Sequence, residues 1–256
     1  MNCFARFAAS ALALSLVPAM LMGCGKKETA ASSDLDYIKQ KGTLVVGITD
    51  FAPMDYQDAD GSWIGFDADL AKAFAESLGV EVQFQTIEWD NKVMELDGKT
   101  IDVVWNGMTL TDEVTSSMAC SNAYCNNAQV VILPADKAAD YGTVDSLSGL
   151  RFAVESGSAG MAQAEEKGLP YTDVVDQATA LLEVKSGTAD AAIIDSLMAG
   201  AMVGAMAGID AVPQVWRDKI SEMNACNFAK DADEILALIP QWHVASESDV
   251  ADLIKE

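Results

Sequence analysis

The chain has 256 residues, with 39 acidic against 16 basic side chains and a formal net charge of −23. This acidity excludes the basic surface that a nucleic-acid-binding protein needs, and it disfavours docking on anionic lipid. Half of the residues are apolar, so the chain can bury a core and is not intrinsically disordered.

The first residues predict a targeting segment. Arg6 precedes an apolar run over residues 7–22, which is short for a membrane span of about 20 residues. The run ends in Leu-Met-Gly-Cys at residues 21–24, which resembles a lipoprotein signal. We therefore expect residues 1–23 to be removed and Cys24 to carry acyl chains, such as palmitate, on the extracytoplasmic face of the cell membrane. An uncleaved anchor or an ordinary secretory signal is the alternative.

Residues 24–42 are expected to form a polar tether and a first helix. From residue 43 to 130, strand and helix patterns alternate. We predict strands at residues 43–48, 80–87 and 101–105, helices at 67–78 and 90–96, and a hairpin tip at Asp60-Gly61. This β-α-β-α-β order indicates a parallel, doubly wound sheet, which we take as a first lobe.

A second lobe is expected from residue 131 to 203, entered by a strand at 128–133. We predict strands at residues 151–154, 172–175 and 189–194, and helices at 161–167 and 178–185. The predicted fold class is α/β, with two doubly wound lobes, a hinge and a cleft between the lobes. Ligands of such sheets bind beyond the carboxyl ends of the strands, and the lobes close around them by a hinge motion.

Three segments carry a resemblance to a known family. They are Ile101–Glu113 (IDVVWNGMTLTDE), Gly65–Leu70 (GFDADL) and Ser186–Ala192 (SGTADAA), which leads to Asp195. Together they resemble the extracellular amino-acid-binding proteins of solute-binding protein family 3, the receptors of ABC importers, over residues 43–196. The resemblance implies a type II periplasmic-binding-protein-like fold, a small amino-acid-like ligand and an ABC permease as partner. It implies no cofactor, no metal and no catalytic residue.

The same resemblance implies how a zwitterion is held. Asp195 matches the aspartate that pairs with the ligand's ammonium; its alternative role is helix N-cap. The turn 156–160 precedes a helix, so its backbone N–H groups form an anion site, with Ser158 and Ala159 as the contacts to the ligand carboxylate. An ordinary glycine-containing connection is the alternative for this turn.

The remaining implied contacts come from both lobes. Phe51 and Trp89 match positions that cover the ligand's side chain, whereas Trp105 is expected in the core. The polar turn after the strand 101–105 is expected to receive the ligand through Asn106, Gly107 and Thr109. Asp50 and Glu155 match family positions that contact the side chain of the ligand, and two acidic residues there favour a cationic or polar ligand. The alternative is that both are solvated acids on the surface.

Two features depart from the family. Val114 stands where the family has a carboxylate-binding arginine, and loss of such a charge-assisted bond costs roughly 1.5–3 kcal/mol. The tail, residues 204–256, shows helix-like stretches at 233–239 and 248–254 but no recognisable strand returning to the first lobe. A shifted reading frame or a divergent tail would produce this pattern, and a missing strand predicts a lowered melting temperature.

An enzyme on the same scaffold, similar to cyclohexadienyl dehydratase, and a sensory module without transport are the alternatives. No nucleophile–base pair is legible, and the single histidine, His243, lies in the tail. One histidine also provides no zinc pattern. Cys120 and Cys125 are the nearest pair for a disulfide, with free thiols, including Cys226, equally compatible with the sequence.

Overall fold

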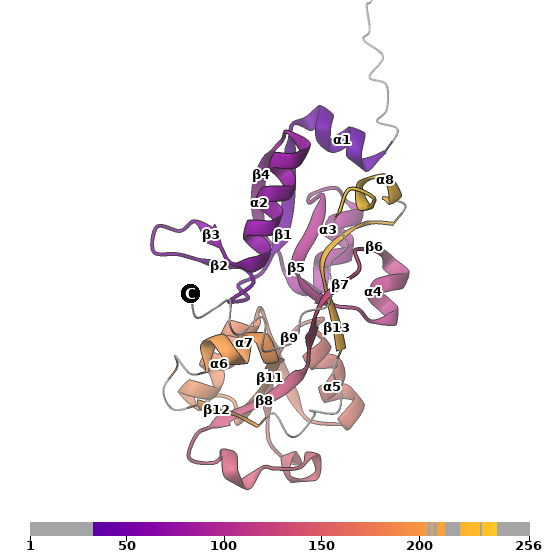
Figure 1. Ribbon diagram of the computed structural model, residues 1–256. Coiled ribbons are helices and arrows are strands. Elements are labelled where there is room, and N and C mark those ends of the chain that lie inside the picture. Colours follow the sequence, from indigo (N-terminus) through magenta and orange to yellow (C-terminus); the bar gives the residue numbers. More distant parts are fainter. Residues whose placement is uncertain (1–32, 204–205, 207–208, 213–220, 231, 240–256) are drawn as a thin grey trace, which may run out of the picture. The chain divides into compact units, whose positions relative to one another are not determined.

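The computed structural model describes residues 33–203, 206, 209–212, 221–230 and 232–239 (Figure 1). All of them belong to one compact unit. The expected signal segment, Cys24, most of the tether, His243 and the expected helix at 248–254 lie outside the described residues. Within the described part, no helix has the length and apolar character needed to cross a bilayer.

The first lobe is built on a six-stranded sheet of order β4-β1-β5-β13-β6, with β7 also paired to β13. β1 is parallel to β4 and β5, as predicted, whereas β13 runs antiparallel to β5. The strands are β1 (Thr43–Ile48), β4 (Glu81–Thr86), β5 (Val103–Thr109), β6 (Met118–Cys120), β7 (Ala123–Asn127) and β13 (Ser221–Ala229), with a separate hairpin of β2 (Tyr56–Gln57) and β3 (Trp63–Ile64). The helices of this lobe are α1 (Asp34–Lys41), α2 (Phe66–Leu78), η1 (Trp89–Asn91), α3 (Lys92–Asp97), α4 (Asp112–Ser117) and α8 (Asp233–Leu236).

The second lobe is built on a five-stranded sheet of order β10-β9-β11-β8-β12. β9 is parallel to β10 and β11, and β8 is antiparallel to β11. The strands are β8 (Gln129–Pro134), β9 (Phe152–Glu155), β10 (Tyr171–Val174), β11 (Ala191–Asp195) and β12 (Ile209–Val212). The helices are η2 (Ala138–Asp140), η3 (Val144–Leu147), α5 (Ala159–Lys167), α6 (Gln177–Ser186) and α7 (Ser196–Met202). The α/β fold class is confirmed.

The tail corrects one expectation. β13 returns to the first lobe and lies beside β5 and β7, as the yellow strand in Figure 1 shows. Cys226, Asn227 and Phe228 are fully buried there. A buried asparagine breaks the apolar pattern by which a central strand is recognised in sequence. The sequence left open whether the tail completes the first lobe; β13 does so, and the predicted loss of thermal stability has lost its premise.

The crossing between lobes also differs from the predicted boundary at residues 130 and 131. The chain leaves the first sheet at Asn127 and joins the second at Gln129, so the predicted boundary falls inside β8.

Apolar side chains on both sheets form the core. In the first lobe Trp105, 1% exposed, packs against Phe74 and has been placed correctly in the core; Phe228 of β13 also contacts Phe74. In the second lobe Val131, Phe152 and Ile193 belong to a separate buried cluster. Burial of each such side chain contributes roughly 1.5–3 kcal/mol before conformational entropy is subtracted.

Cys120, Cys125 and Cys226, on the neighbouring strands β6, β7 and β13, are not joined to one another by a disulfide. Burial raises the pKa of Cys125 to about 12, and Cys226 is shifted in the same direction by the same cause. These thiols are therefore uncharged at neutral pH and behave as small apolar side chains.

A bulge in β5 replaces the turn that was predicted after Trp105. The strand continues to Thr109, and its pairing with β13 shifts register between Asn224 and Cys226. Asn106 and Gly107 lie at this shift, and Gly107 has φ 54°, a left-handed conformation that glycine adopts without strain. The bulge re-aims the end of β5 where it faces the second lobe.

Candidate ligand-binding site

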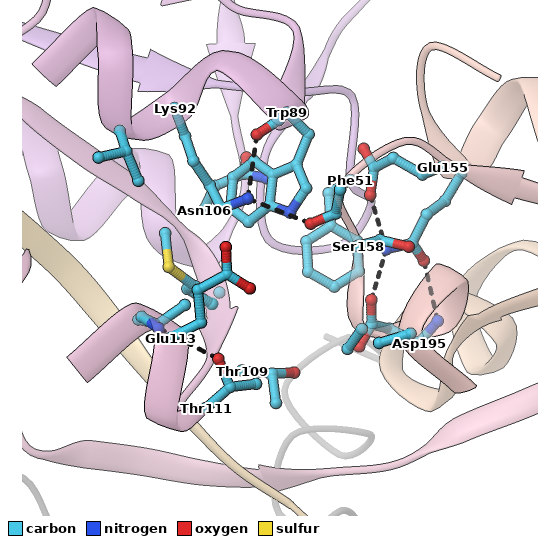
Figure 2. Close-up of a pocket in the computed structure, with 18 of the residues that line it drawn as sticks. Phe51, Trp89, Lys92, Asn106, Thr109, Thr111, Glu113, Glu155, Ser158 and Asp195 are labelled. Atoms are coloured by element: carbon cyan, nitrogen blue, oxygen red, sulfur yellow. Dashed lines mark hydrogen bonds between the residues drawn. The ribbon is translucent and has the colours of Figure 1, made fainter. Parts of the chain in front are cut away.

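One pocket is lined by residues of both lobes. Figure 2 shows most of its lining. The first lobe contributes Phe51, Trp89, Lys92, Val93, Asn106, Gly107, Met108, Thr109, Thr111, Glu113, Val114 and Met118; the second contributes Glu155, Gly157, Ser158, Ala159, Ala162, Gln177 and Asp195. Every ligand contact expected from the sequence is in this set except Asp50.

Asp195 ends β11 and is buried beneath the pocket. It occupies the N-cap position of α7, but its side chain makes no capping hydrogen bond. Its Oδ1 accepts hydrogen bonds from the side-chain amides of Asn127 and Gln129, and its Oδ2 accepts one from Gln177. Burial raises the pKa of Asp195, and the three amides oppose that rise. The carboxylate thus lines the pocket and does not cap the helix.

Glu155 ends β9 and is 3% exposed, so it is not a solvated surface acid. Its Oε2 accepts a hydrogen bond from Gln177 Nε2 at 3.3 Å, and its Oε1 has no partner among the described atoms. Burial, and secondarily the charge of Asp195, raise its pKa to about 8. With no cation in contact, Glu155 is therefore largely protonated at neutral pH.

The turn before α5 leaves the backbone N–H of Ala159 without an acceptor among the described residues. Ser158 is the N-cap: its Oγ accepts from Met161 N at 3.1 Å, and its own N–H donates to Glu155 O at 3.2 Å. Ala159 begins the nine-residue helix, and no acceptor for its N–H is found among the described residues. Of the two expected backbone contacts, Ala159 is the one left available to an anion.

Gly157 brings the two lobes into contact at the edge of the pocket. Its φ is 68°, and a Cβ placed there would lie 2.7 Å from Asp90 Oδ1 and 2.8 Å from Asp90 Cα. The turn of the second lobe therefore lies directly against η1 of the first lobe. The glycine permits both the backbone conformation and this approach.

Buried aromatic side chains form the apolar wall of the first lobe. Phe51 and Trp89 are 3% and 8% exposed, and both line the pocket as expected. Asn106 also lines the pocket, but its side-chain amide is hydrogen-bonded to Thr49. Its Oδ1 accepts from Thr49 N at 3.0 Å, and its Nδ2 donates to Thr49 Oγ1 at 2.8 Å. Asn106 thus joins β5 to the end of β1 and shapes the wall.

Asp50 was not placed correctly by the sequence. It is exposed and lines a different hollow, together with Asp176. Partial burial and the charge of Asp176 raise its pKa. Adjacent residues of an extended segment point to opposite sides, which explains why Phe51 reaches the pocket and Asp50 does not.

Lys92 is the main residue that the sequence did not reveal. Its Nζ donates to Trp89 O and to Gly157 O, both at 3.1 Å, and lies 4.9 Å from the centroid of the Trp89 ring; the two bonds are dashed in Figure 2. Burial lowers its pKa, and Glu113, Glu155 and Asp90 oppose that shift in decreasing order. Val114, where the family has arginine, is a buried apolar part of the same wall.

The charges that line the pocket are not neutralised by one another. Among the described residues, no salt bridge within 4.0 Å involves Lys92, Glu113, Glu155 or Asp195. No group of three or more His, Cys, Asp or Glu side chains in the described part is placed to hold a metal ion. The pocket offers separate basic and acidic groups between aromatic and apolar walls.

Comparison with known proteins is consistent with this arrangement. A family model described as bacterial extracellular solute-binding proteins, family 3, matches residues 44–249. An L-cystine-binding protein of Escherichia coli strain K12 is 29% identical over 184 residues, which cover 71% of this chain and 69% of that protein.

Two solved structures share the fold. The arginine-bound form of a truncated ArgBP from T. maritima has a TM-score of 0.73 and 30% identity, covering 86% of this chain and 98% of that one. An ancestral amino acid-binding protein, a precursor of cyclohexadienyl dehydratase, has a TM-score of 0.74 and 29% identity, covering 87% and 94%. The two-lobed architecture is that of the type II periplasmic binding proteins.

Proposed function

The chain belongs to the bacterial extracellular solute-binding proteins of family 3, and from this premise we propose that it captures an amino acid or a similar small polar solute for an ABC importer. The observation that carries the proposal is the pocket between the lobes, where buried Asp195 and Glu155 lie close to the N-terminus of α5. A zwitterion needs an acceptor for its ammonium and a donor for its carboxylate, and this pocket offers both.

Asp195 is the proposed partner of the ligand ammonium. Its carboxylate accepts three amide hydrogen bonds, which leave capacity for one more donor on Oδ2. These amides also fix its orientation, so no side-chain entropy has to be lost when the ligand binds. A charge-assisted hydrogen bond here contributes roughly 1.5–3 kcal/mol.

The acidic balance of the pocket favours a cationic or polar side chain over an acidic one. Besides Asp195, the described lining has Glu113 and Glu155, whose carboxyl group is neutral until a cation lowers its pKa, against Lys92 as the one basic side chain. A ligand with a second negative charge would be repelled by these acidic groups, and the described lining has no second cation to pair with it. Phe51 and Trp89 would cover the carbon chain of the ligand.

The cellular setting is part of the same proposal. The Leu-Met-Gly-Cys motif supports an anchor on Cys24 at the outer face of the cell membrane, from which the receptor delivers its solute to a permease. Metabolic labelling with palmitate tests the anchor. We expect label in the wild type and none in Cys24→Ser; equal labelling of both would contradict it.

A thermal-shift panel of amino acids, amines and short peptides tests the binding function. A ligand at 100 times its Kd should add about 2.7 kcal/mol to the free energy of unfolding. The shift should be lost in Asp195→Asn and retained in Asp145→Asn, which makes the same chemical change at an exposed position. A flat panel with a folded protein, or an unchanged shift in Asp195→Asn, would contradict the proposal.

An enzyme remains the second candidate because Glu155 is held protonated and could donate a proton. Incubation with a cyclohexadienyl acid, followed by the absorbance of an aromatic product, decides between the two. We expect no turnover above the buffer control. Turnover that disappears in Glu155→Gln would establish the enzyme instead.

A further inference from the structure

Lys92 is the one cationic side chain among the described residues that line the pocket. It begins α3 in the first lobe, and Val114, at the position of the family's arginine, lines the same pocket without any charge to offer. The pocket therefore has one cationic side chain, but it comes from a different element than the family pattern predicts.

The bonding of Lys92 leaves its charge without a counter-ion in contact. Two of its three ammonium protons go to the carbonyl oxygens of Trp89 and Gly157, and neither of these is an anion. The carboxylates of Glu113, Glu155 and Asp90 act on it only at longer range, because none lies within 4.0 Å. A partly buried ammonium without a paired anion is costly, and an incoming carboxylate would remove that cost.

A second donor lies near the same point of the pocket. Gly157, whose carbonyl accepts from Lys92, is two residues before Ala159, whose N–H is free at the start of α5. Figure 2 shows the Lys92 ammonium reaching across from the first lobe to this turn. We infer that Lys92 and the Ala159 N–H together bind the ligand's carboxylate, and that Lys92 takes the role of the arginine replaced by Val114. This inference rests on the proposed amino-acid-binding function.

The same geometry couples recognition to closure. Lys92 holds one carbonyl from each lobe, Trp89 in the first and Gly157 in the second. A carboxylate bound to its third proton would fix the ammonium in the position that bridges the lobes. A ligand without a carboxylate would lack this contribution.

The test compares amino acids with their decarboxylated amines: L-arginine with agmatine, L-histidine with histamine, and L-lysine with cadaverine. Affinities are measured by titration calorimetry on the wild type, Lys92→Met, Lys92→Arg and the control Lys185→Met, which removes an exposed lysine. We expect Lys92→Met to weaken the amino acid roughly ten- to a hundredfold and to leave the amine within about threefold of the wild type. Lys92→Arg should retain most of the affinity for the amino acid.

An equal loss for the amino acid and its amine would assign Lys92 a structural role and overturn the inference, with the proposed function intact. Wild-type protein that binds none of the amino acids would overturn the proposed function and the inference with it. If Lys92→Met does not fold, wild-type binding of L-argininamide against L-arginine supplies the same comparison. Equal affinity for these two ligands would contradict a carboxylate contact.

Discussion

Replacing Glu155 with glutamine should reduce the pH dependence of the stability of the ligand-free protein, to which buried Asp55 and Asp67, whose pKa is also raised by burial, contribute as well. The pKa of Glu155 rises from 4.5 to about 8 because folding buries the carboxyl group beside Asp195. At about 1.4 kcal/mol per pKa unit, this rise corresponds to on the order of 5 kcal/mol. The side chain is almost completely buried, so solvent screening does not reduce that figure much.

The direction of the effect follows from proton binding in the two states. Below about pH 4.5 the Glu155 carboxyl group is protonated in both the folded and the unfolded chain, so it makes no pH-dependent contribution to the free energy of unfolding. Between pH 4.5 and about 8 the unfolded chain releases the proton while the folded protein keeps it, so the free energy of unfolding falls as pH rises. Above about pH 8 both states are ionised and the loss is complete.

Urea unfolding of the ligand-free protein at pH 5, 6, 7, 8 and 9 measures this loss. The wild type should lose several kcal/mol more than Glu155→Gln across the range, which for a chain of this size corresponds to a difference of about 10 °C or more in melting temperature. Glu76→Gln, on the exposed face of α2, is the matched control and should follow the wild type. Identical pH profiles for the wild type and Glu155→Gln would refute the reasoning.

The remaining predictions concern ligand binding. A cationic ligand should lower the pKa of Glu155, so that binding at pH 7 releases up to about one proton to the buffer. The binding enthalpies measured in phosphate and in Tris should therefore differ for the wild type and agree for Glu155→Gln. Equal enthalpies in the two buffers for the wild type would contradict this. Gly157→Ala should weaken ligand binding at least tenfold, because its Cβ would lie 2.7 Å from Asp90 Oδ1 and prevent the two lobes from approaching. Calorimetry measures the affinity. Wild-type affinity in this variant would show that the approach is not needed.

Local patterns predicted most of the fold. Helix α2 ends at Gly79 in the left-handed conformation, as its capping signal indicated, and β9, β10 and β11 lie within a few residues of their expected positions. These elements have regular apolar periodicity and clear stop signals. β13 lacks both, since buried Asn227 interrupts its apolar pattern, and only its pairing with β5 and the neighbouring strands makes it a strand.

The site could be predicted where residues follow a strand end and resemble a family motif. Phe51, Glu155 and Asp195 line the pocket as this reasoning placed them, and their contacts with a ligand stay predictions. Lys92 could not be found, because a lysine at the start of a helix is typical of a solvated surface, and its partner Gly157 is 65 positions away in the chain. Gln177 was missed for a similar reason: it begins α6, and only the fold places its amide between Glu155 and Asp195.

The structure of the complex tests the central claim most directly. Crystals should be grown with the amino acid that gives the largest thermal shift. We expect the ligand's ammonium within hydrogen-bonding distance of Asp195 and its carboxylate at the Ala159 N–H and Lys92 Nζ, with the ligand between Phe51 and Trp89. A ligand bound outside this pocket, or with its carboxylate directed toward Asp195 and its ammonium toward Lys92, would contradict it.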